Sequence, residues 1–573
     1  MGWLFASLRG YRRAWLPRDA MAGVTVWAVL VPESLAYASI AGVSPVVGLY
    51  AAAPALVLYA AFGSSRHLVV GPMSATAALS AATVAVLATS GTDQYVALTA
   101  ALAVVTGVIG LLAGLCRLGF VASFISEPVL KGFIVGLALT IIVGQLPKLF
   151  GVEKGAGDFF EQLWDLLGRL GDTNGWTLAV GVASLVVVVA LKRWVPLLPG
   201  SLVAVLLGIA AVDMFGLDDK GVAIVGHIEA GLPSFGLPHV AHAHDYLDLA
   251  GPAVGILLVG FAEGLGAAKT YAARAGYDID PNRELIGLGA ANLGGGLSSG
   301  MVVNGSLSKT AVNGTAGAKS QVSGLVVAAL TVVTLLFLTG LFENLPEATL
   351  AAVVIAAVVE LVDIPALRHL YRVWTRRLGG IYGLAARTDF IAAIAAMLGV
   401  LIFDTLPGLF IGIGVSLLLL VYRASRPHIA TLVRAPGQPG AGPAVWVDAA
   451  RHPDGRAEPR ILVVRVESGL FFANSDYVRQ HIRTHLASDT VAVVLDGETT
   501  PAIDVTATEM LSQLAHDLDR RRVTLMIARD IGQVRDVVHK ASPDPSTHHI
   551  YATVDDAIIA AREITRQTGE AAP

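Results

Sequence analysis

Polar and charged side chains stand inside an otherwise apolar, membrane-length part of the chain, between residues 261 and 320. The carboxylate of Glu263 follows one long apolar run, and Ser308 and Lys309 stand at the start of another. An isolated charge at the centre of a membrane helix costs about 2.5 to 3.5 kcal/mol on insertion scales, and such charges usually serve a transport pathway. These residues therefore predict a binding site for a small charged substrate within the membrane.

A similar pair of segments occurs nearer the N-terminus. Val31-Pro32-Glu33-Ser34 is followed by Gly71-Pro72-Met73-Ser74-Ala75-Thr76, just as Phe261-Ala262-Glu263-Gly264 is followed by Gly305-Ser306-Leu307-Ser308. Each pair has an acidic residue in one span and a glycine-containing start of a short span two helices later. Paired short segments in two halves of a chain are typical of transporters built from inverted repeats with discontinuous helices. We predict two half-helices that begin near the bilayer midplane.

Two such helix ends would favour an anion. The first N–H groups of a helix have no intrahelical partner and carry the positive end of the helix dipole. Serine and threonine hydroxyls can add hydrogen-bond donors, and a lysine in the first turn adds positive field. Serine and threonine also permit close packing of membrane helices. For any single hydroxyl, ligand binding and helix packing are therefore both open interpretations. The candidate substrate-binding residues are Ser74, Ala75, Thr76, Leu307, Ser308 and Lys309.

The composition is that of a protein with many membrane spans. Of the 573 residues, 54% are hydrophobic and only 15% are charged, and the mean hydropathy is +0.66. An ordinary soluble protein of this length does not have such values. The formal net charge of −4 gives no indication of nucleic-acid binding, and the single cysteine, Cys116, allows no disulfide framework.

Counting about 20 apolar residues for each crossing of the hydrocarbon core predicts fourteen spans. Lysine and arginine collect in cytoplasmic loops, and with a cytoplasmic N-terminus the predicted inner loops contain most of them, including Lys192, Arg193, Lys269 and Arg274. The even number of spans then places both termini in the cytoplasm. The spans are predicted to start near residues 22, 46, 72, 95, 129, 176, 199, 249, 284, 305, 321, 348, 388 and 407.

Composition also divides the chain into segments. Residues 1–20 form a predicted cytoplasmic N-terminal segment, 21–424 the transmembrane transporter domain, 425–443 a linker, 444–566 a soluble domain and 567–573 a disordered tail. In the soluble domain, short buried strands at 461–466, 491–495 and 523–527 alternate with a helix at 507–520, which indicates a small α/β sheet.

The sequence gives little support for catalysis or metal binding. Catalytic or metal-ligating constellations are missing from the predicted spans, so we expect a protein that is not an enzyme and needs no cofactor. His242, His244 and Asp245 stand together near a predicted outer surface. They lack a further thiolate or histidine at ligand spacing, which favours a solvated loop over a metal site.

Three ordered motifs resemble the sulfate permease (SulP/SLC26) family of anion transporters across nearly the whole chain. They are residues 19–50, with Pro32-Glu33-Ser34 at their centre, residues 71–76, and the 263–320 region described above. The resemblance implies a seven-plus-seven inverted repeat of fourteen spans, with a core domain from spans 1–4 and 8–11 and a gate domain from spans 5–7 and 12–14. It also implies substrate held between spans 3 and 10, a homodimer, and elevator-like movement of the core against the gate.

Two positions depart from the family pattern. The family commonly has Gln where this chain has Glu33, and Arg where it has Lys309. Lysine keeps the charge but lacks the planar fork that grips an oxyanion through two hydrogen bonds. The choice of substrate is therefore open within the family.

The loop at 496–506 resembles that of STAS domains, which usually accompany these transporters and offer a surface for a cytoplasmic partner. Thr506 stands where the regulatory relatives of this fold carry a phosphorylated serine. The alternative role, a hydroxyl that caps the following helix, is expected in preference to a phosphorylation site.

Coupling to protons is expected on energetic grounds. Moving a divalent anion inward against an interior-negative potential costs about 4.6 kcal/mol per 100 mV, from roughly 2.3 per elementary charge. Protonation of Glu263 would cancel charge beside the incoming anion, whereas Ala267, one helical turn on, offers no oxygen ligand for sodium. Glu33 is either a second proton carrier or a residue of the cavity wall, and both roles are equally supported.

We therefore expect a proton-coupled sulfate symporter of the bacterial inner membrane that works by an elevator mechanism. Within the same family, bicarbonate, a C4-dicarboxylate such as fumarate, or chloride exchange are alternatives. An anion channel would share the binding site but would not need Glu263. A membrane sensor acting through the cytoplasmic domain is a further alternative.

Overall fold

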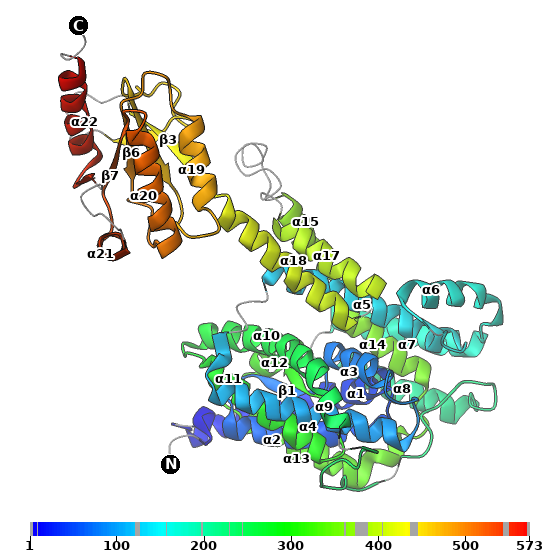
Figure 1. The fold of residues 1–573 in the computed structure, drawn as a ribbon. Helices are drawn as coiled ribbons and strands as arrows, with labels where there is room; N and C mark the ends of the chain where they lie inside the picture. The colour runs from blue at the N-terminus through cyan, green and yellow to red at the C-terminus, as the bar shows by residue number, and fades with distance from the viewer. Residues whose placement is uncertain are drawn as a thin grey trace. The chain divides into compact units, whose positions relative to one another are not determined.

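A computed structural model describes most of the chain and divides it into two compact units (Figure 1). One unit comprises Met1–Val373 and Asp389–Ser416, and the other Trp374–Thr388 and Leu417–Pro573. The described residues are 4–8, 10–120, 126–155, 157–195, 199–228, 230–242, 244–359, 362–372, 388–403, 405–435, 445–541 and 549–569.

The first unit is helical and multi-pass. Within the described ranges, eight helices are long and apolar enough to cross a membrane, and four shorter apolar helices accompany them. Together with α11 and α12, they coincide with the predicted spans. The first half contains α1 (Leu16–Ile40), α2 (Val46–Phe62), α3 (Ser74–Val84), α4 (Asp93–Leu115), α5 (Glu127–Phe150), α7 (Gly175–Trp194) and α8 (Gly200–Phe215). The second half contains α10 (Ala250–Ala275), α11 (Pro281–Leu297), α12 (Leu307–Thr315), α13 (Val322–Val333), α14 (Glu347–Val359), α17 (Thr388–Phe403) and α18 (Thr405–Ser425).

Shorter elements connect these helices. They are η1 (Ala6–Leu8), η2 (Arg13–Trp15), α6 (Phe159–Gly168), η4 (Leu170–Asp172), α9 (Asp245–Asp248), the π-helical η5 (Thr334–Leu338), η6 (Thr339–Phe342) and α15 (Ile364–Arg372).

A two-stranded antiparallel sheet joins the two halves of the membrane unit. Strand β1 (Val69–Gly71) precedes α3, and strand β2 (Asn304–Ser306) precedes α12. In the register of the pair, Val70 lies opposite Gly305. All six residues are buried, so their backbone polar groups need partners, and the pairing provides them.

Helix α11 packs closely against α4, as Figure 1 shows. Glycine makes this approach possible, because a Cβ on Gly107 of α4 would lie 2.5 Å from the backbone nitrogen of Leu293 in α11. A side chain at Gly107 would force the two helices apart.

Two buried carboxylates fix loops to helices in this unit. Glu284 of α11 accepts hydrogen bonds from the hydroxyl of Tyr59 (2.7 Å) and from the backbone N–H and hydroxyl of Ser64 (2.8 and 2.6 Å). Asp19 of α1 accepts from the N–H of Lys319 (2.6 Å) and the hydroxyl of Ser320 (2.7 Å). Hydrogen bonds of this kind compensate for the burial of a charge, so Glu284, although part of the family motif, is structural.

The second unit contains a six-stranded sheet in the order β4-β3-β5-β6-β7-β8. Strands β5 to β8 are parallel, and β3 pairs antiparallel with both β4 and β5. The elements are β3 (Ile429–Arg434), β4 (Trp446–Asp448), β5 (Ile461–Val466), α19 (Ser475–Thr484), β6 (Ala492–Asp496), α20 (Val505–Asp519), β7 (Thr524–Ala528), α21 (Gly532–Ala541), β8 (His549–Tyr551) and α22 (Val554–Gly569).

Helices cover both faces of this sheet, as Figure 1 shows. Val464, Val493 and Leu525 face the cluster made with α19, α20 and α21. Their strand neighbours Val463 and Val494 face the cluster made with α22. The alternation follows from the period of two along a strand, and burial on both sides explains the nearly continuous apolar runs that predicted these strands.

Three expectations for this unit need correction. β3 lies inside 425–443, the segment predicted to be a linker. The strand was not predicted because a short strand next to a Pro- and Gly-rich stretch has little periodic signal. Residues 436–443 lie outside the described residues. Asp504, not Thr506, caps α20, accepting from the N–H of Ala507 at 2.8 Å. Helix α22 ends at Gly569, within the predicted disordered tail, whose residues 570–573 lie outside the described residues.

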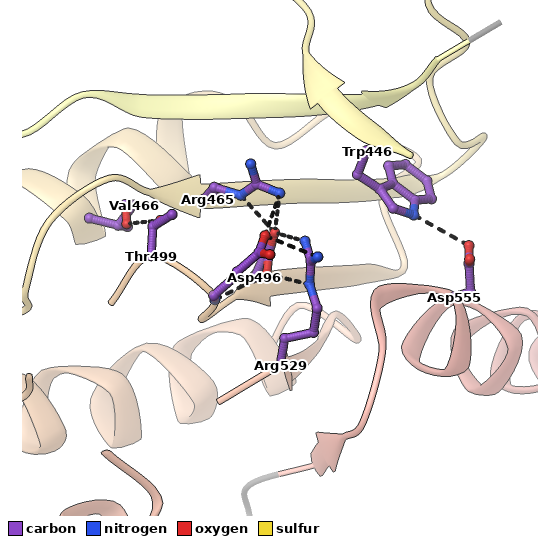
Figure 2. A network of polar contacts seen from close by, with 8 residues as sticks. Trp446, Arg465, Val466, Asp496, Thr499, Arg529 and Asp555 are labelled. Atoms are coloured by element: carbon purple, nitrogen blue, oxygen red, sulfur yellow. Dashed lines mark hydrogen bonds and ion pairs between the residues drawn. The ribbon is translucent and has the colours of Figure 1, made fainter. Parts of the chain in front are cut away.

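A buried ionic network closes the end of β6 (Figure 2). Asp496 is fully buried and accepts from Arg465 Nε at 2.8 Å and Arg529 Nε at 3.0 Å. Glu498 lies 3.3 Å from Arg465 and 3.0 Å from Arg529. Two carboxylates therefore balance two guanidinium groups at this edge of the sheet.

Candidate anion-binding site

The strand pair positions the N-terminal ends of α3 and α12. Helix α12 starts directly after β2, and α3 starts shortly after β1. Because β1 and β2 are antiparallel, the two helices leave the sheet in opposite directions, each with its N-terminus near the strands. The strand pair thus links the two segments that the sequence analysis selected, residues 74–76 and 307–309, and Lys309 reaches the carbonyl of Pro72 at 2.9 Å.

The start of α3 has no side-chain cap. Met73 is the N-cap residue and makes no capping hydrogen bond. Ser74 is 4% exposed, and its hydroxyl makes no hydrogen bond with any residue that the structure describes. Thr76 is fully buried and its hydroxyl donates to the carbonyl of Met73 at 3.3 Å, while Ala75 is also buried. Ser74 and the first-turn N–H groups are therefore the donors that α3 offers.

The start of α12 is partly capped and partly exposed. Ser306 accepts a hydrogen bond from the N–H of Lys309 at 3.2 Å, and its hydroxyl lies 3.1 Å from that of Ser308. Thr310 accepts from the N–H of Val69 at 3.0 Å, which ties α12 to β1. Leu307 and Ser308 are exposed. A ligand approaching this helix end would meet Leu307 and Ser308 first.

Lys309 is held inside the protein by three groups. Its side chain is 1% exposed, and its ammonium lies 3.1 Å from Glu33 Oε2. It donates to the carbonyl of Pro72 at 2.9 Å and lies 5.0 Å from the centre of the Tyr37 ring. A buried ammonium needs such partners. Its positive charge is therefore balanced locally by Glu33.

This ion pair was missed by sequence reasoning, although a signal was present. Glu33 and Lys309 are the two positions that depart from the family pattern, and their charges are opposite. Glu33 belongs to α1 next to Pro32 and is 8% exposed. Lysine keeps the charge of the arginine that is common in the family, so the signal was the added carboxylate of Glu33, which needs a cationic partner when it is buried.

Glu263 lies on α10 and faces β2. It accepts a hydrogen bond from the side-chain amide of Asn304 at 3.3 Å. The helix approaches the strand closely, because a Cβ on Gly305 would lie 2.9 Å from Gly264 Cα. Asn304 had no assigned role in the sequence analysis, and its position in β2 could not be read from periodicity in a three-residue strand. With Glu33, Glu263 and Lys309 all ionised, the site has two negative charges and one positive charge.

Other candidate residues lie elsewhere. Thr506 is exposed near the start of α20, in the α/β unit. The potential ligand atoms of His242, His244 and Asp245 lie within 4.8 Å of one another, with both histidines exposed. His244 Nε2 is 3.5 Å from Asp245 Oδ1. The choice between a solvated loop and a metal site stays a prediction.

The helical unit with two discontinuous helices, together with its α/β unit, defines a multi-pass membrane transporter for anions. Residues 16–379 match the model of the sulfate permease family, and residues 452–557 match that of the STAS domain. The chain belongs to the sulfate permease family. The resemblance found in its motifs is thereby confirmed, and so is the expectation of a transporter rather than an enzyme.

Relatives agree with this assignment, and solved structures share the fold. A probable sulfate transporter of Mycobacterium tuberculosis is 35% identical over 98% of both chains. High affinity sulfate transporter 1 of Stylosanthes hamata is 29% identical over 94% of this chain and 83% of its own. The structure of SLC26A9 superimposes with a TM-score of 0.86 at 22% identity, covering 100% of this chain and 94% of that one. The transmembrane domain of a cyanobacterial bicarbonate transporter, BicA, gives 0.60 at 22% identity over 69% of this chain and 98% of that one.

Proposed function

We propose that this chain is a proton-coupled sulfate symporter that works by an elevator-type movement. The names of the relatives support sulfate, since those from Mycobacterium tuberculosis and Stylosanthes hamata are both described as sulfate transporters. The geometry supports an anion, because the paired strands β1 and β2 each lead into a helix N-terminus, and Ser74 and Ser308 offer hydroxyls in the first turns.

The observation that carries the proton coupling is the charge of the site. Glu33 neutralises Lys309 at 3.1 Å, which leaves the carboxylate of Glu263 as the uncompensated charge. At an effective dielectric constant of about 20 and a separation of about 6 Å, one carboxylate repels a dianion by about 5 to 6 kcal/mol. Protonation removes this repulsion, so proton uptake and sulfate binding favour each other.

The two glutamates have separate roles in this proposal. Glu263 takes up the proton that accompanies sulfate, and Asn304 holds its carboxylate against β2 through the 3.3 Å hydrogen bond. Glu33 is the partner of Lys309 and takes up a second proton when sulfate draws on the ammonium. Two protons per sulfate would make the transport electroneutral and remove the cost of about 4.6 kcal/mol per 100 mV that a bare dianion meets.

The movement follows the connection of the two helix ends. β1 and β2 are hydrogen-bonded to each other, and Thr310 bonds to Val69, so α3 and α12 must move together. We propose that they belong to a core of spans 1–4 and 8–11 that slides against a gate of spans 5–7 and 12–14. The same proposal places a homodimer in a bacterial inner membrane with both termini cytoplasmic and with the STAS domain free to bind a partner or to be phosphorylated at Thr506.

Uptake by the purified full-length chain in liposomes tests the function. We expect an inward proton gradient to drive accumulation of labelled sulfate, and a sodium gradient to have no effect. Glu263→Gln should abolish accumulation but retain exchange of sulfate for sulfate, because a neutral side chain no longer carries the proton but still permits binding. Undiminished gradient-driven uptake by this variant would refute the assignment.

The same preparation separates the alternatives. Competition by bicarbonate, fumarate or chloride, each with a direct uptake measurement, identifies the substrate within the family. An anion channel would pass labelled anion without accumulation and would not respond to Glu263→Gln. Lys269→Gln, on an exposed position near the end of the same helix, is a matched control for a change of charge on α10.

A further inference from the structure

A cavity lies beside α3, toward the end of the helix away from the strand pair. Its volume is about 600 Å³. One wall is a face of α3 made only of alanines, at residues 78, 81, 82 and 85. Ser74 and Ala78 lie on the same face of α3, because residues three and four apart in a helix are neighbours on its surface. The cavity therefore starts one helical turn beyond Ser74, on the same face of α3.

A second wall is a face of α5. Thr140, Ile141, Gly144, Gln145 and Lys148 line it. Gln145 is 7% exposed and makes no hydrogen bond with any described residue. Buried side-chain amides are nearly always hydrogen-bonded, and the alanines of α3 offer no side-chain partner. The amide of Gln145 is therefore available to a molecule inside the cavity.

Two ammonium groups also line this cavity. Lys148 lies one turn beyond Gln145 on α5. Lys154 follows α5 in the chain, and its ammonium lies 3.7 Å from the position that a Cβ on Gly144 would occupy. Lys148 is paired with Glu347 at 3.2 Å and remains one-third exposed. Asp158, the carboxylate in the lining, is directed at the start of α6, where it accepts from two backbone N–H groups. The cavity is thus lined by two ammonium groups, one of them paired with Glu347, and by one carboxylate that caps α6.

We propose that this cavity is a second anion site, which captures an inorganic oxyanion before it reaches α3 and α12. The amide of Gln145 donates a hydrogen bond to the anion, and Lys148 and Lys154 supply the positive potential. Ammonium groups on the wall of a cleft raise the local concentration of an anion and its rate of association. The inference rests on the proposed function, since it takes the transported oxyanion as the ligand.

Transport kinetics give the first test, with labelled sulfate and the full-length chain in liposomes. Gln145→Leu and Lys154→Gln should each raise KM for sulfate about threefold to tenfold and leave the saturated rate within about twofold, since capture precedes the transport step. The effect of Lys154→Gln should shrink as ionic strength rises, because salt screens a partly exposed charge. Lys220→Gln removes an equal charge from an exposed position outside this cavity and should leave KM unchanged. Wild-type KM values in both cavity variants would overturn the proposal.

Chemical labelling gives a second test that does not depend on transport. Cys116 is the single cysteine and is exposed, so Cys116→Ser provides a background in which Ala81→Cys introduces one thiol into the cavity wall. With each rate divided by that of the same reagent with a small thiol in solution, we expect an anionic methanethiosulfonate to react several-fold faster than a cationic one of similar size, and inorganic sulfate to slow the anionic reagent. Adding Gln145→Glu should abolish both effects.

The capture site and the symport function can be refuted independently of each other. Equal reaction rates of the two reagents with no protection by sulfate would overturn the second site, even if the chain accumulates sulfate. Sulfate protection in a chain that does not accumulate sulfate would refute the symport function and retain the capture site. Loss of protection in Gln145→Glu with normal folding, judged by the melting temperature, would support the proposed ligand contact.

Discussion

Replacing Lys309 by methionine is expected to destabilise the membrane unit through the charge that it leaves behind. The Lys309 ammonium is 3.1 Å from Glu33 Oε2, and the two side chains are 1% and 11% exposed. At an effective dielectric constant of about 20, this separation corresponds to an attraction of about 5 kcal/mol. Removing one partner of a buried pair typically costs 3 to 5 kcal/mol, because the other charge stays buried. The lost hydrogen bond to the carbonyl of Pro72 adds about 1 kcal/mol.

The double variant Lys309→Met/Glu33→Gln separates the two contributions. It removes the uncompensated carboxylate, so we expect it to recover all but about 1 to 2 kcal/mol of the lost stability. The assay is the melting temperature of the full chain in detergent, where 1 kcal/mol corresponds to about 1 to 2 °C for a unit of this size. Lys309→Met should melt about 5 °C below wild type, and the double variant only slightly below it. Equal melting temperatures for the single and the double variant would show that the carboxylate left behind costs no stability, and would refute this reasoning.

Two further predictions concern packing and pH. Gly305→Ala should lower the melting temperature and the uptake rate, because its Cβ would lie 2.9 Å from Gly264 Cα and would separate β2 from α10 at a cost of about 1 to 3 kcal/mol. Gly266→Ala is the control, since a Cβ there would have nothing within 4 Å. An equal effect of both changes would contradict the packing argument. In the α/β unit, burial and then the charge of His485 lower the pKa of His481 from 6.5 to about 4. The unfolded chain binds a proton in this window that the folded unit does not, so stability should fall as the pH drops from 6.5 toward 4, by on the order of 1 kcal/mol for a half-exposed group. Hydrogen exchange of β6 and β7, corrected for intrinsic rates, should show this loss of stability in wild type and in the exposed control His452→Gln. The loss should be smaller in His481→Gln. An unchanged loss in His481→Gln would assign the effect to other groups.

Sequence was sufficient to predict the arrangement of helices and the general position of the site. Long apolar runs predict spans because lipid offers no hydrogen-bond partners to an exposed backbone. The two glycine-containing segments predict the broken helices because helix starts at the midplane need small residues and donors. In the structure, these two segments meet at β1 and β2.

The partners of individual side chains could not be predicted in the same way. Lys309 was expected to add positive field for the ligand, whereas the structure pairs it with Glu33. Thr76 was expected to donate to the ligand, and its hydroxyl instead donates to the carbonyl of Met73. Both contacts depend on which atoms face one another across the packed unit, and neither one-dimensional spacing nor helical periodicity contains that information. The cap of α20 was misassigned for a simpler reason, since Asp504 and Thr506 are both good capping residues.

The pairing of β1 with β2 has a consequence for how the protein is made. Residues 69–71 are synthesised long before residues 304–306, yet they depend on them for their backbone hydrogen bonds. Unpaired N–H and C=O groups in lipid each cost several kcal/mol, so the earlier segment is unstable at its final depth until the later one emerges from the ribosome. The N-terminal half must therefore wait, shielded by the insertion machinery or held near the membrane surface, and its broken helix is completed only when the second half is inserted.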